Sequence, residues 1–287
     1  MPKHFLNIPA VYRLGTVWSG YIPQFLSYWL SQGIAGLSYL LCKSAVKNVK
    51  QNLKLALPTL SEKEISRLTM QLFRNYSKYL VDYARFTGLS KEAVLEKVAT
   101  YCGRENLDSA LRMGKGLILL TAHLGNWELG GIFFGSSGIK TNVITIKDQD
   151  PQIDEIRRWY REKYNVSTIT IGESPFSTME IMRALNNKEI VAMLIDRYSS
   201  GLDSITVDFF NKPTPFPRGP LILSRLTGSP IVVAFVVREK ETYKGIIGKP
   251  LMVTHENEEC EVMKQVVKTL EDHILKYPDQ WYNFTPI

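Results

Sequence analysis

The sequence predicts an α/β protein with a mostly parallel central sheet flanked by helices and preceded by a helical, hydrophobic N-terminal segment. Two observations predict this class. From Gly116 onward, short β-branched or aliphatic runs alternate with stretches of helical periodicity, an order that builds parallel strands joined by crossover helices. Before Gly116 the chain reads as helical. The 287 residues and 45% hydrophobic content suit one substantial domain, or a core domain with a helical appendage.

The stretch from Leu14 to Cys42 contains no charged residue. It is long enough to span a bilayer, for which about 20 apolar residues suffice, but Pro, Gly, Gln and Ser interrupt it. Its Trp and Tyr residues are spread along the whole stretch, as in a helix that lies in the membrane interface. Three interpretations stay open: attachment in the plane of the membrane, a true span, and buried helices of a soluble protein. We expect residues 1–42 to form a hydrophobic segment that attaches to a membrane.

Residues 43–113 are expected to be helical, and residues 114–287 to form the α/β core. In the helical part, Ser61 and Glu64 give the capping-box pattern that starts a helix. The expected strands of the core are "LILLTA", "NVITI", "STITI", "IVAMLI", "ITVDFF" and "IVVAFVV". Between them, "DPQIDEIRRWYREKY" and "STMEIMRALNN" carry helical patterns, and the last helix ends before Pro278.

The formal net charge is +7 and the sequence pI is about 9.1, which favours anionic partners such as nucleic acid, an acidic membrane surface or an acidic carrier protein. Nucleic-acid binding is disfavoured because the basic residues are dispersed and no recognition motif occurs. Three isolated cysteines without a CxxC pair argue against a disulfide framework and against a zinc site. The four histidines are scattered and no HExxH motif occurs, so we expect no metal and no cofactor.

The candidate site is the stretch "LILLTAHLGNWELGG", in which Glu128 follows His123 at the spacing H-x4-E. On one continuous helix the two side chains would point about 140° apart. If the apolar run is a buried strand, however, His123 lies in the turn after it. Gly125 or Asn126 then caps the next helix, and Glu128 falls in its first turn. Strand ends of this kind are where α/β sheets bind their ligands.

The His and Glu side chains suggest proton transfer. A neutral imidazole takes a proton from an alcohol when a carboxylate fixes its tautomer and stabilises the imidazolium. No GxSxG motif signals a serine nucleophile, so the pair suits direct attack by a bound acceptor hydroxyl on an activated acyl group. The structural alternative is a histidine satisfied in the core and a glutamate that caps its helix.

Several motifs resemble one known family. "AHLGNWELGG" resembles the HX4E motif of the late acyltransferases of lipid A biosynthesis, which belong to the wider HX4D/E glycerolipid acyltransferase group. Four further segments are similar to blocks of that family: "KNVKQNLKLALPTLSEKEI", "RRWYREKYNVSTI", "VAMLIDRYSSGLDSITVDFFNKPTPFPRGPLILSRLTGSPIVV" and "EDHILKYPDQWYNF", the last of which carries the terminal P-x-Q-W element. The resemblance implies a glycerolipid acyltransferase-like fold, with residues 43–287 as the acyltransferase domain.

The resemblance also implies a role for each matching residue. His123 would be the general base and Glu128 its orienting partner. Substrate-binding roles are implied for Asn126, Arg161, Asp196, Arg197, Arg218 and Gly219. Arg218 and Gly219 open an expected helix whose backbone N–H groups can bind an anion.

These features predict a membrane-associated O-acyltransferase at the bacterial inner membrane, with its active site on the cytoplasmic face. It would move a fatty acyl chain from acyl carrier protein or acyl-coenzyme A to a hydroxyl of a lipid A precursor or related glycolipid. The ending "QWYNFTPI" lacks the basic-aromatic residues common in the family, and Asn211 replaces a usual glycine. The first departure leaves the acceptor open, with phosphatidylinositol mannosides among the alternatives. A non-catalytic lipid-binding protein on the same fold and a hydrolase are the other interpretations.

Overall fold

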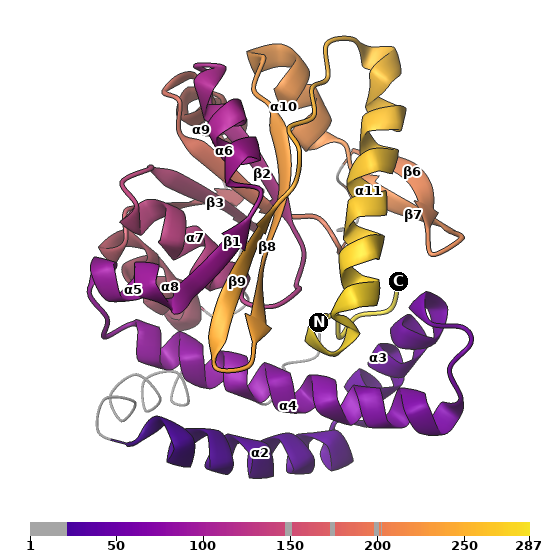
Figure 1. Ribbon diagram of the computed structural model, residues 1–287. Helices are drawn as coiled ribbons and strands as arrows, with labels where there is room; N and C mark the ends of the chain where they lie inside the picture. Colours follow the sequence, from indigo (N-terminus) through magenta and orange to yellow (C-terminus); the bar gives the residue numbers. More distant parts are fainter. Residues whose placement is uncertain (1–21, 147–150, 173–175, 198–200, 202) are drawn as a thin grey trace.

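The computed structural model describes residues 22–146, 151–172, 176–197, 201 and 203–287. In this described part, a seven-stranded central sheet has the order β1-β9-β8-β2-β5-β3-β4. Every neighbouring pair of strands is parallel except β8 with β9. Helices cover both faces of the sheet (Figure 1), so the expected α/β class with a mostly parallel sheet is confirmed.

The elements have the following bounds. The central sheet contains β1 (Val98–Cys102), β2 (Leu117–Thr121), β3 (Thr141–Ile146), β4 (Val166–Ile171), β5 (Ile190–Leu194), β8 (Ile231–Glu239) and β9 (Thr242–Ile247), and a separate hairpin contains β6 (Ser204–Phe209) and β7 (Lys212–Pro217). The helices are α2 (Gln24–Leu41), α3 (Lys43–Ala56), α4 (Glu62–Phe86), α5 (Lys91–Lys97), α6 (Arg104–Arg112), α7 (Trp127–Ser136), α8 (Pro151–Lys163), α9 (Ser177–Asn186), α10 (Gly219–Thr227) and α11 (Glu259–Lys276), with short 3-10 helices η1 (Glu256–Glu258) and η2 (Pro278–Gln280).

Two strands differ from the sequence-based expectation. β1 lies within residues 43–113, which were expected to be helical, and it pairs with β9 at the edge of the sheet. The expected strand "ITVDFF", which is β6, does not join the central sheet but pairs with β7. β7 contains three prolines, Pro213, Pro215 and Pro217. A proline has no backbone N–H, so a proline-rich strand fits a peripheral hairpin and is excluded from the centre of a sheet.

The centre of the sheet is buried on both faces. Every residue of β2 is buried, and successive side chains enter different core clusters. Ile118 and Leu120 pack on the face covered by α9, α10 and α11. Leu117 and Leu119 pack on the opposite face with Ala110 of α6 and Phe134 of α7. This continuous apolar burial is typical of a parallel strand between two helical layers.

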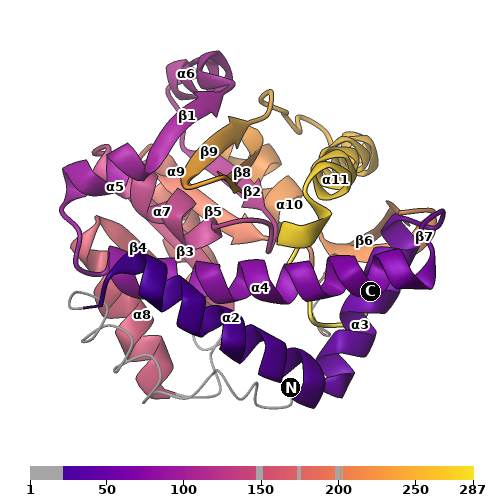
Figure 2. The same cartoon turned by 60° about the horizontal axis from the view of Figure 1, so that its bottom comes forward.

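Two long helices cross the carboxyl-terminal end of the sheet. Figure 1 shows α4 lying across the end toward which β8 points, with α2 on the far side of α4. Figure 2, viewed from that end, shows α2 and α4 side by side with the C-terminus close to α3. Among the residues described, no helix combines the length and apolar character that a membrane crossing requires. The first eight residues of the uncharged stretch, Leu14–Tyr21, lie outside the described residues.

One glycine sets the distance between α7 and α8. A Cβ atom on Gly135 would lie 2.0 Å from the carbonyl oxygen of Tyr164, which immediately follows α8. Only a residue without a side chain therefore allows these two segments to touch. The close approach matters for the site because α7 carries Glu128 and α8 carries Arg161.

We expect Gly135→Ala to destabilise the protein because the new methyl group must displace backbone. Overpacking of this kind lowers the free energy of unfolding by about 1–3 kcal/mol. The matched control is Gly131→Ala in the same helix, where the new Cβ would meet its nearest neighbour, the Val143 side chain, at 3.8 Å. The control gains helix propensity, worth about 0.5–1 kcal/mol. Denaturant unfolding should show a lower free energy of unfolding for Gly135→Ala and a higher one for Gly131→Ala. An equal change in the free energy of unfolding of both variants would contradict the close contact at Gly135.

Candidate active site

The candidate site forms in the turn between β2 and α7. Asn126 is the N-cap of α7, and its side-chain oxygen accepts a hydrogen bond of 2.9 Å from the Leu129 amide. Gly125 has a φ of +67°, and a Cβ at this position would lie 2.1 Å from the Val236 carbonyl oxygen. The Asn126 amide donates to that same carbonyl at 2.7 Å. The expected strand–turn–helix around His123 is thus present, and it is fastened to β8.

The carboxylate that contacts the imidazole is that of Asp196. His123 Nδ1 lies 2.7 Å from Asp196 Oδ1, and the Asp196 side chain has no solvent exposure. β2 and β5 are parallel neighbours in which Thr121 pairs with Leu194. His123 and Asp196 each lie two residues beyond that pair, so the strand register brings them together. Because an ionised carboxylate only accepts hydrogen bonds, Nδ1 carries the proton and Nε2 is left as the basic nitrogen.

Glu128 has a different partner from the one expected. Arg161 binds the Glu128 carboxylate through two hydrogen bonds, from Nε at 3.1 Å and from Nη2 at 2.5 Å. Both side chains are buried. Glu128 was expected to be the orienting partner of His123, but the carboxylate that contacts the imidazole directly is that of Asp196. The reason is that Glu128 lies in the first turn of α7, on the side that faces α8.

The C-terminal segment completes the site. The indole N–H of Trp281 donates to Asp196 Oδ2 at 3.1 Å, so both carboxylate oxygens of Asp196 are engaged. The Tyr282 amide donates to the His123 carbonyl at 2.7 Å, and the Gly125 amide donates to the Gln280 carbonyl at 2.9 Å. The P-x-Q-W element and the residue after it thus hold the turn that carries His123. Sequence reasoning recognised this element but gave none of its residues a role.

The electrostatics keep His123 neutral at neutral pH. Burial lowers the pKa of His123, and the positive charge of Arg197 lowers it further, against the opposing effect of Asp196. Burial alone would raise the pKa of Asp196, but the interaction with His123, the positive charge of Arg197 and the Trp281 hydrogen bond outweigh it and bring that pKa to about 2. Burial likewise opposes ionisation of Glu128, yet the Arg161 guanidinium holds its pKa below the usual value. The site therefore combines a neutral imidazole with two ionised carboxylates.

A mostly apolar cavity of about 280 Å³ lies beside this turn, on the sheet face beneath α7. Its lining includes Thr121, Trp127, Glu128 and Arg161 near the turn. Farther along, the lining includes the α6 residues Leu107 and Leu111 and the sheet residues Ala192, Ala234 and Ile247. His123 itself does not line the cavity, but its ring makes an edge-on contact with Trp127 at 5.0 Å between centroids. A long apolar chain could therefore lie here with its polar end near His123.

The remaining expected site residues divide into two groups. Arg197 lies next to Asp196, where its guanidinium donates to the Tyr282 carbonyl at 2.7 Å and to the Asn283 side chain at 3.2 Å. Arg218 is elsewhere, with its guanidinium bound by Glu256 and Glu259 at the start of α11. Because α11 is 18 residues long, its start lies about 27 Å from its end. At that end, η2 contacts the turn that carries His123. The structure therefore does not bring Arg218 and Gly219 to the turn.

One basic residue near the site was not expected. Arg157 precedes Arg161 by one helical turn of α8, and its charge influences the pKa values of His123, Glu128 and Arg161. The signal in the sequence was the repetition of Arg at positions 157 and 161 on one helix face.

Within the described ranges, no group of three or more His, Cys, Asp or Glu side chains could hold a metal ion.

Comparison with known proteins gives consistent matches. The family model of the bacterial lipid A biosynthesis acyltransferases matches residues 10–286. The chain is 25% identical to a lipid A biosynthesis lauroyltransferase of Escherichia coli K12 over 228 residues, which cover 78% of this chain and 71% of that protein. It is 23% identical to the lipid A biosynthesis palmitoleoyltransferase of the same strain over 289 residues, 98% of this chain and 90% of that protein.

A second group of relatives has a different name. With a phosphatidylinositol mannoside acyltransferase of Mycobacterium tuberculosis H37Rv the identity is 24% over 187 residues, 64% of this chain, and the match spans only 58% of that relative's length. Among solved structures, the 1-acyl-sn-glycerophosphate acyltransferase of Thermotoga maritima matches 87% of this chain and 95% of its own, with 14% identity and a TM-score of 0.39. On the match of the family model across nearly the whole sequence, this chain belongs to the bacterial lipid A biosynthesis acyltransferase family.

Proposed function

We propose that the protein is a membrane-associated O-acyltransferase that moves a fatty acyl chain from acyl carrier protein or acyl-coenzyme A to a hydroxyl of a lipid A precursor or a related glycolipid. The observation that carries the proposal is the His123–Asp196 pair beside the apolar cavity. Membership of an acyltransferase family supports the reaction type. Relatives named for lipid A and for phosphatidylinositol mannosides support a glycolipid acceptor.

In the proposed reaction, His123 Nε2 accepts the proton of the acceptor hydroxyl while the hydroxyl oxygen attacks the thioester carbonyl. A C–O bond forms, the C–S bond of the donor breaks, and the imidazolium returns its proton to the leaving thiolate. Asp196 fixes the Nδ1–H tautomer and stabilises the imidazolium between these two steps. The proton balance is closed, so no further reactant is required.

The Glu128–Arg161 pair is proposed to shape the reacting end of the cavity. Both side chains line it, and their two hydrogen bonds join α7 to α8. Arg161 Nη1 also donates to Thr168 of β4 at 3.2 Å, so the guanidinium is held from two sides. A fixed guanidinium at this place would stabilise the negative charge that develops on the carbonyl oxygen during acyl transfer. The apolar remainder of the cavity would hold the acyl chain.

We expect His123→Gln to lower the rate of acyl transfer by about 10²- to 10⁴-fold, because the general base is lost. The assay offers labelled acyl carrier protein and acyl-coenzyme A with a panel of lipid A precursors and phosphoglycolipids in detergent micelles. The matched control is His255→Gln, the same change at an exposed position. A product with one added acyl chain that persists at wild-type rate in His123→Gln would reject the mechanism. Release of free fatty acid without acceptor would indicate a hydrolase. If the wild type gives neither acylated product nor free fatty acid, a lipid-binding protein would be favoured.

In the pH profile of kcat/KM, we expect the activity to be lost on the acid side at a midpoint below pH 6.5, since burial lowers the pKa of the His123 base. This acid-side fall is called the acid limb. Asp196→Asn removes the negative charge that stabilises the imidazolium, so the limb should move to still lower pH and the rate should fall about 10²- to 10⁴-fold. Glu128→Gln is the comparison, because its carboxylate binds Arg161 and not Nδ1. Should Glu128→Gln move the limb further than Asp196→Asn does, Glu128 would be the orienting carboxylate that the sequence predicted.

Membrane attachment is proposed to occur through α2. In a helix of a soluble protein the large apolar residues face inward, but in α2 they face outward. Its buried positions are Ser31, Ala35 and Ser38, all small. Gln24 and Gln32 donate hydrogen bonds inward, to Tyr28 of the same helix and to α4. The outward residues are large and apolar: Phe25, Leu26, Trp29, Leu30, Ile34, Leu37, Leu40 and Leu41. We propose that this face lies in the plane of the cytoplasmic leaflet of the bacterial inner membrane, close to the catalytic turn.

We expect the double variant Phe25→Glu with Trp29→Glu to weaken binding to vesicles of phosphatidylglycerol and phosphatidylcholine. These two side chains are 75% and 71% exposed, and burying each in lipid contributes about 1.5–3 kcal/mol, so affinity should fall at least about tenfold. Leu226→Glu is the control, an exposed leucine on α10. Vesicle flotation measures both. Equal binding by the double variant and the control would place the membrane contact elsewhere.

A further inference from the structure

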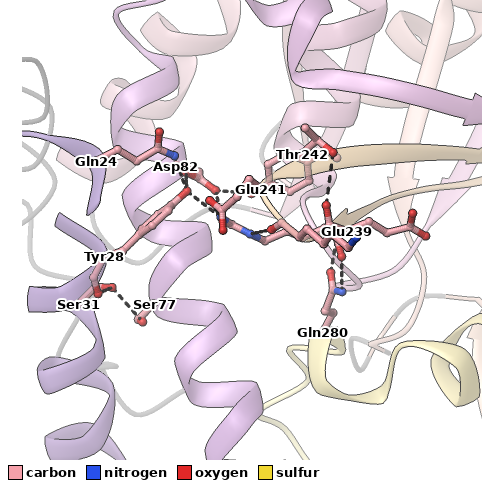
Figure 3. Close-up of polar contacts among 12 residues, drawn as sticks. Gln24, Tyr28, Ser31, Ser77, Asp82, Glu239, Glu241, Thr242 and Gln280 are labelled. Atoms are coloured by element: carbon pink, nitrogen blue, oxygen red, sulfur yellow. Dashed lines mark hydrogen bonds and ion pairs between the residues drawn. The ribbon is translucent and has the colours of Figure 1, made fainter. Parts of the chain in front are cut away.

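A buried ion pair lies where α2, α4 and the β8–β9 hairpin meet. Asp82 of α4 accepts a hydrogen bond of 2.8 Å from Arg238 at the end of β8. It also accepts hydrogen bonds from the hydroxyls of Tyr28 on α2, at 2.6 Å, and of Tyr243 on β9. Arg238 donates in addition to the Tyr28 oxygen at 3.0 Å. Figure 3 shows Tyr28 pointing from α2 toward Asp82. We call these four residues the Asp82 cluster.

Stability alone does not explain this cluster. Asp82 is 2% exposed, and burial raises its pKa against the opposing charge of Arg238. Replacing a buried ion pair by apolar residues of similar volume is often neutral or stabilising, and in some proteins such pairs fix one arrangement among several. We infer that the Asp82 cluster fixes the position of α2, because Tyr28 of α2 forms hydrogen bonds with both Asp82 and Arg238.

The backbone of Arg238 continues the link to the catalytic turn. The Arg238 amide donates to Gln280 Oε1 at 2.8 Å, and Gln280 Nε2 donates back to the Arg238 carbonyl at 2.9 Å. In Figure 3 the Gln280 side chain reaches toward the end of β8. The Gln280 carbonyl in turn accepts from the Gly125 amide.

The next residues reach the reacting group. Trp281 donates to Asp196, the carboxylate that holds His123. The Tyr282 amide binds the His123 carbonyl. A continuous series of hydrogen bonds therefore runs from Tyr28 through Asp82, Arg238 and Gln280 to the turn that carries His123.

We propose that Tyr28, Asp82 and Arg238 are positioning residues that fix the height of the catalytic turn relative to the membrane helix α2. The inference rests on the proposed function, because it concerns an acceptor lipid embedded in a bilayer. The hydroxyl of such a lipid is held at the depth set by its own anchoring, so the enzyme must present His123 at that depth. A misplacement of about 1 Å at a reacting centre costs about 10²-fold in rate. An acceptor in a detergent micelle is free to adjust its depth and does not impose this demand.

The test uses Tyr28→Phe, which removes one hydroxyl and two hydrogen bonds of the cluster and keeps the aromatic ring. The control is Tyr39→Phe, the same change near the other end of α2. Acyl transfer is measured with the acceptor in phosphatidylglycerol–phosphatidylcholine vesicles and in micelles. For Tyr28→Phe the vesicle rate should fall at least about tenfold while the micelle rate stays within about twofold. Vesicle flotation should show unchanged binding, and Asp82→Asn should give the same selective loss.

Equal losses in vesicles and micelles would overturn the inference, because the cluster would then only support the fold. Unchanged rates in both would overturn it as well. A second measurement needs no substrate and so separates this inference from the proposed function. Amide hydrogen exchange at Gly125 and Asn126 should be faster in vesicle-bound Tyr28→Phe than in Tyr39→Phe. Identical exchange in the two variants would reject the link even if acyl transfer is established.

Discussion

The geometry of the candidate active site depends on one constraint, the parallel register between β2 and β5. Because Thr121 pairs with Leu194, the residues two positions beyond each strand end meet, and these are His123 and Asp196. A slip of one residue would turn one of these side chains to the wrong face of the sheet. The register is itself protected, since alternate residues of β2 are buried in separate cores on the two faces. The contact between His123 and Asp196 is thus specified by the same apolar packing that forms the sheet.

Much of the fold could be predicted from the sequence, and the exceptions have physical causes. The long apolar strands and the capping box at Ser61 followed from local pattern alone, and the structure has both. β1 has the same length as β2 but only its first residue is buried, so it lacks the apolar run that would separate it from the helices around it. β7 was not predicted because its three prolines argue against a strand. The prolines are tolerated there because β7 lies in a peripheral hairpin.

The candidate site was predictable in its residues more than in its pairings. His123, Asn126 and Arg161 were found from the motif and the resemblance, and the structure brings all three to one region. Which carboxylate contacts the imidazole depends on strand register, which a single sequence does not reveal. A single sequence likewise does not reveal that the Arg218 side chain, expected to help bind an anion, forms ion pairs with Glu256 of η1 and Glu259 of α11. The hydrogen bonds of Trp281 with Asp196 and of Gln280 with Arg238 could not be predicted, because they join segments far apart in the chain.

The contribution of Trp281 has a consequence for the biogenesis of the protein. Asp196 lies 73 residues after His123, and Trp281 a further 85 residues after Asp196. During synthesis the imidazole and its carboxylate therefore leave the ribosome long before the indole that completes their hydrogen bonding. The α2 helix, by contrast, is synthesised before all of these residues, and its large apolar side chains are the ones proposed to contact lipid. Under the proposed membrane attachment and mechanism, the growing chain would reach the membrane before the hydrogen bonds around His123 and Asp196 are complete, and a prematurely released product would lack the Trp281 contact.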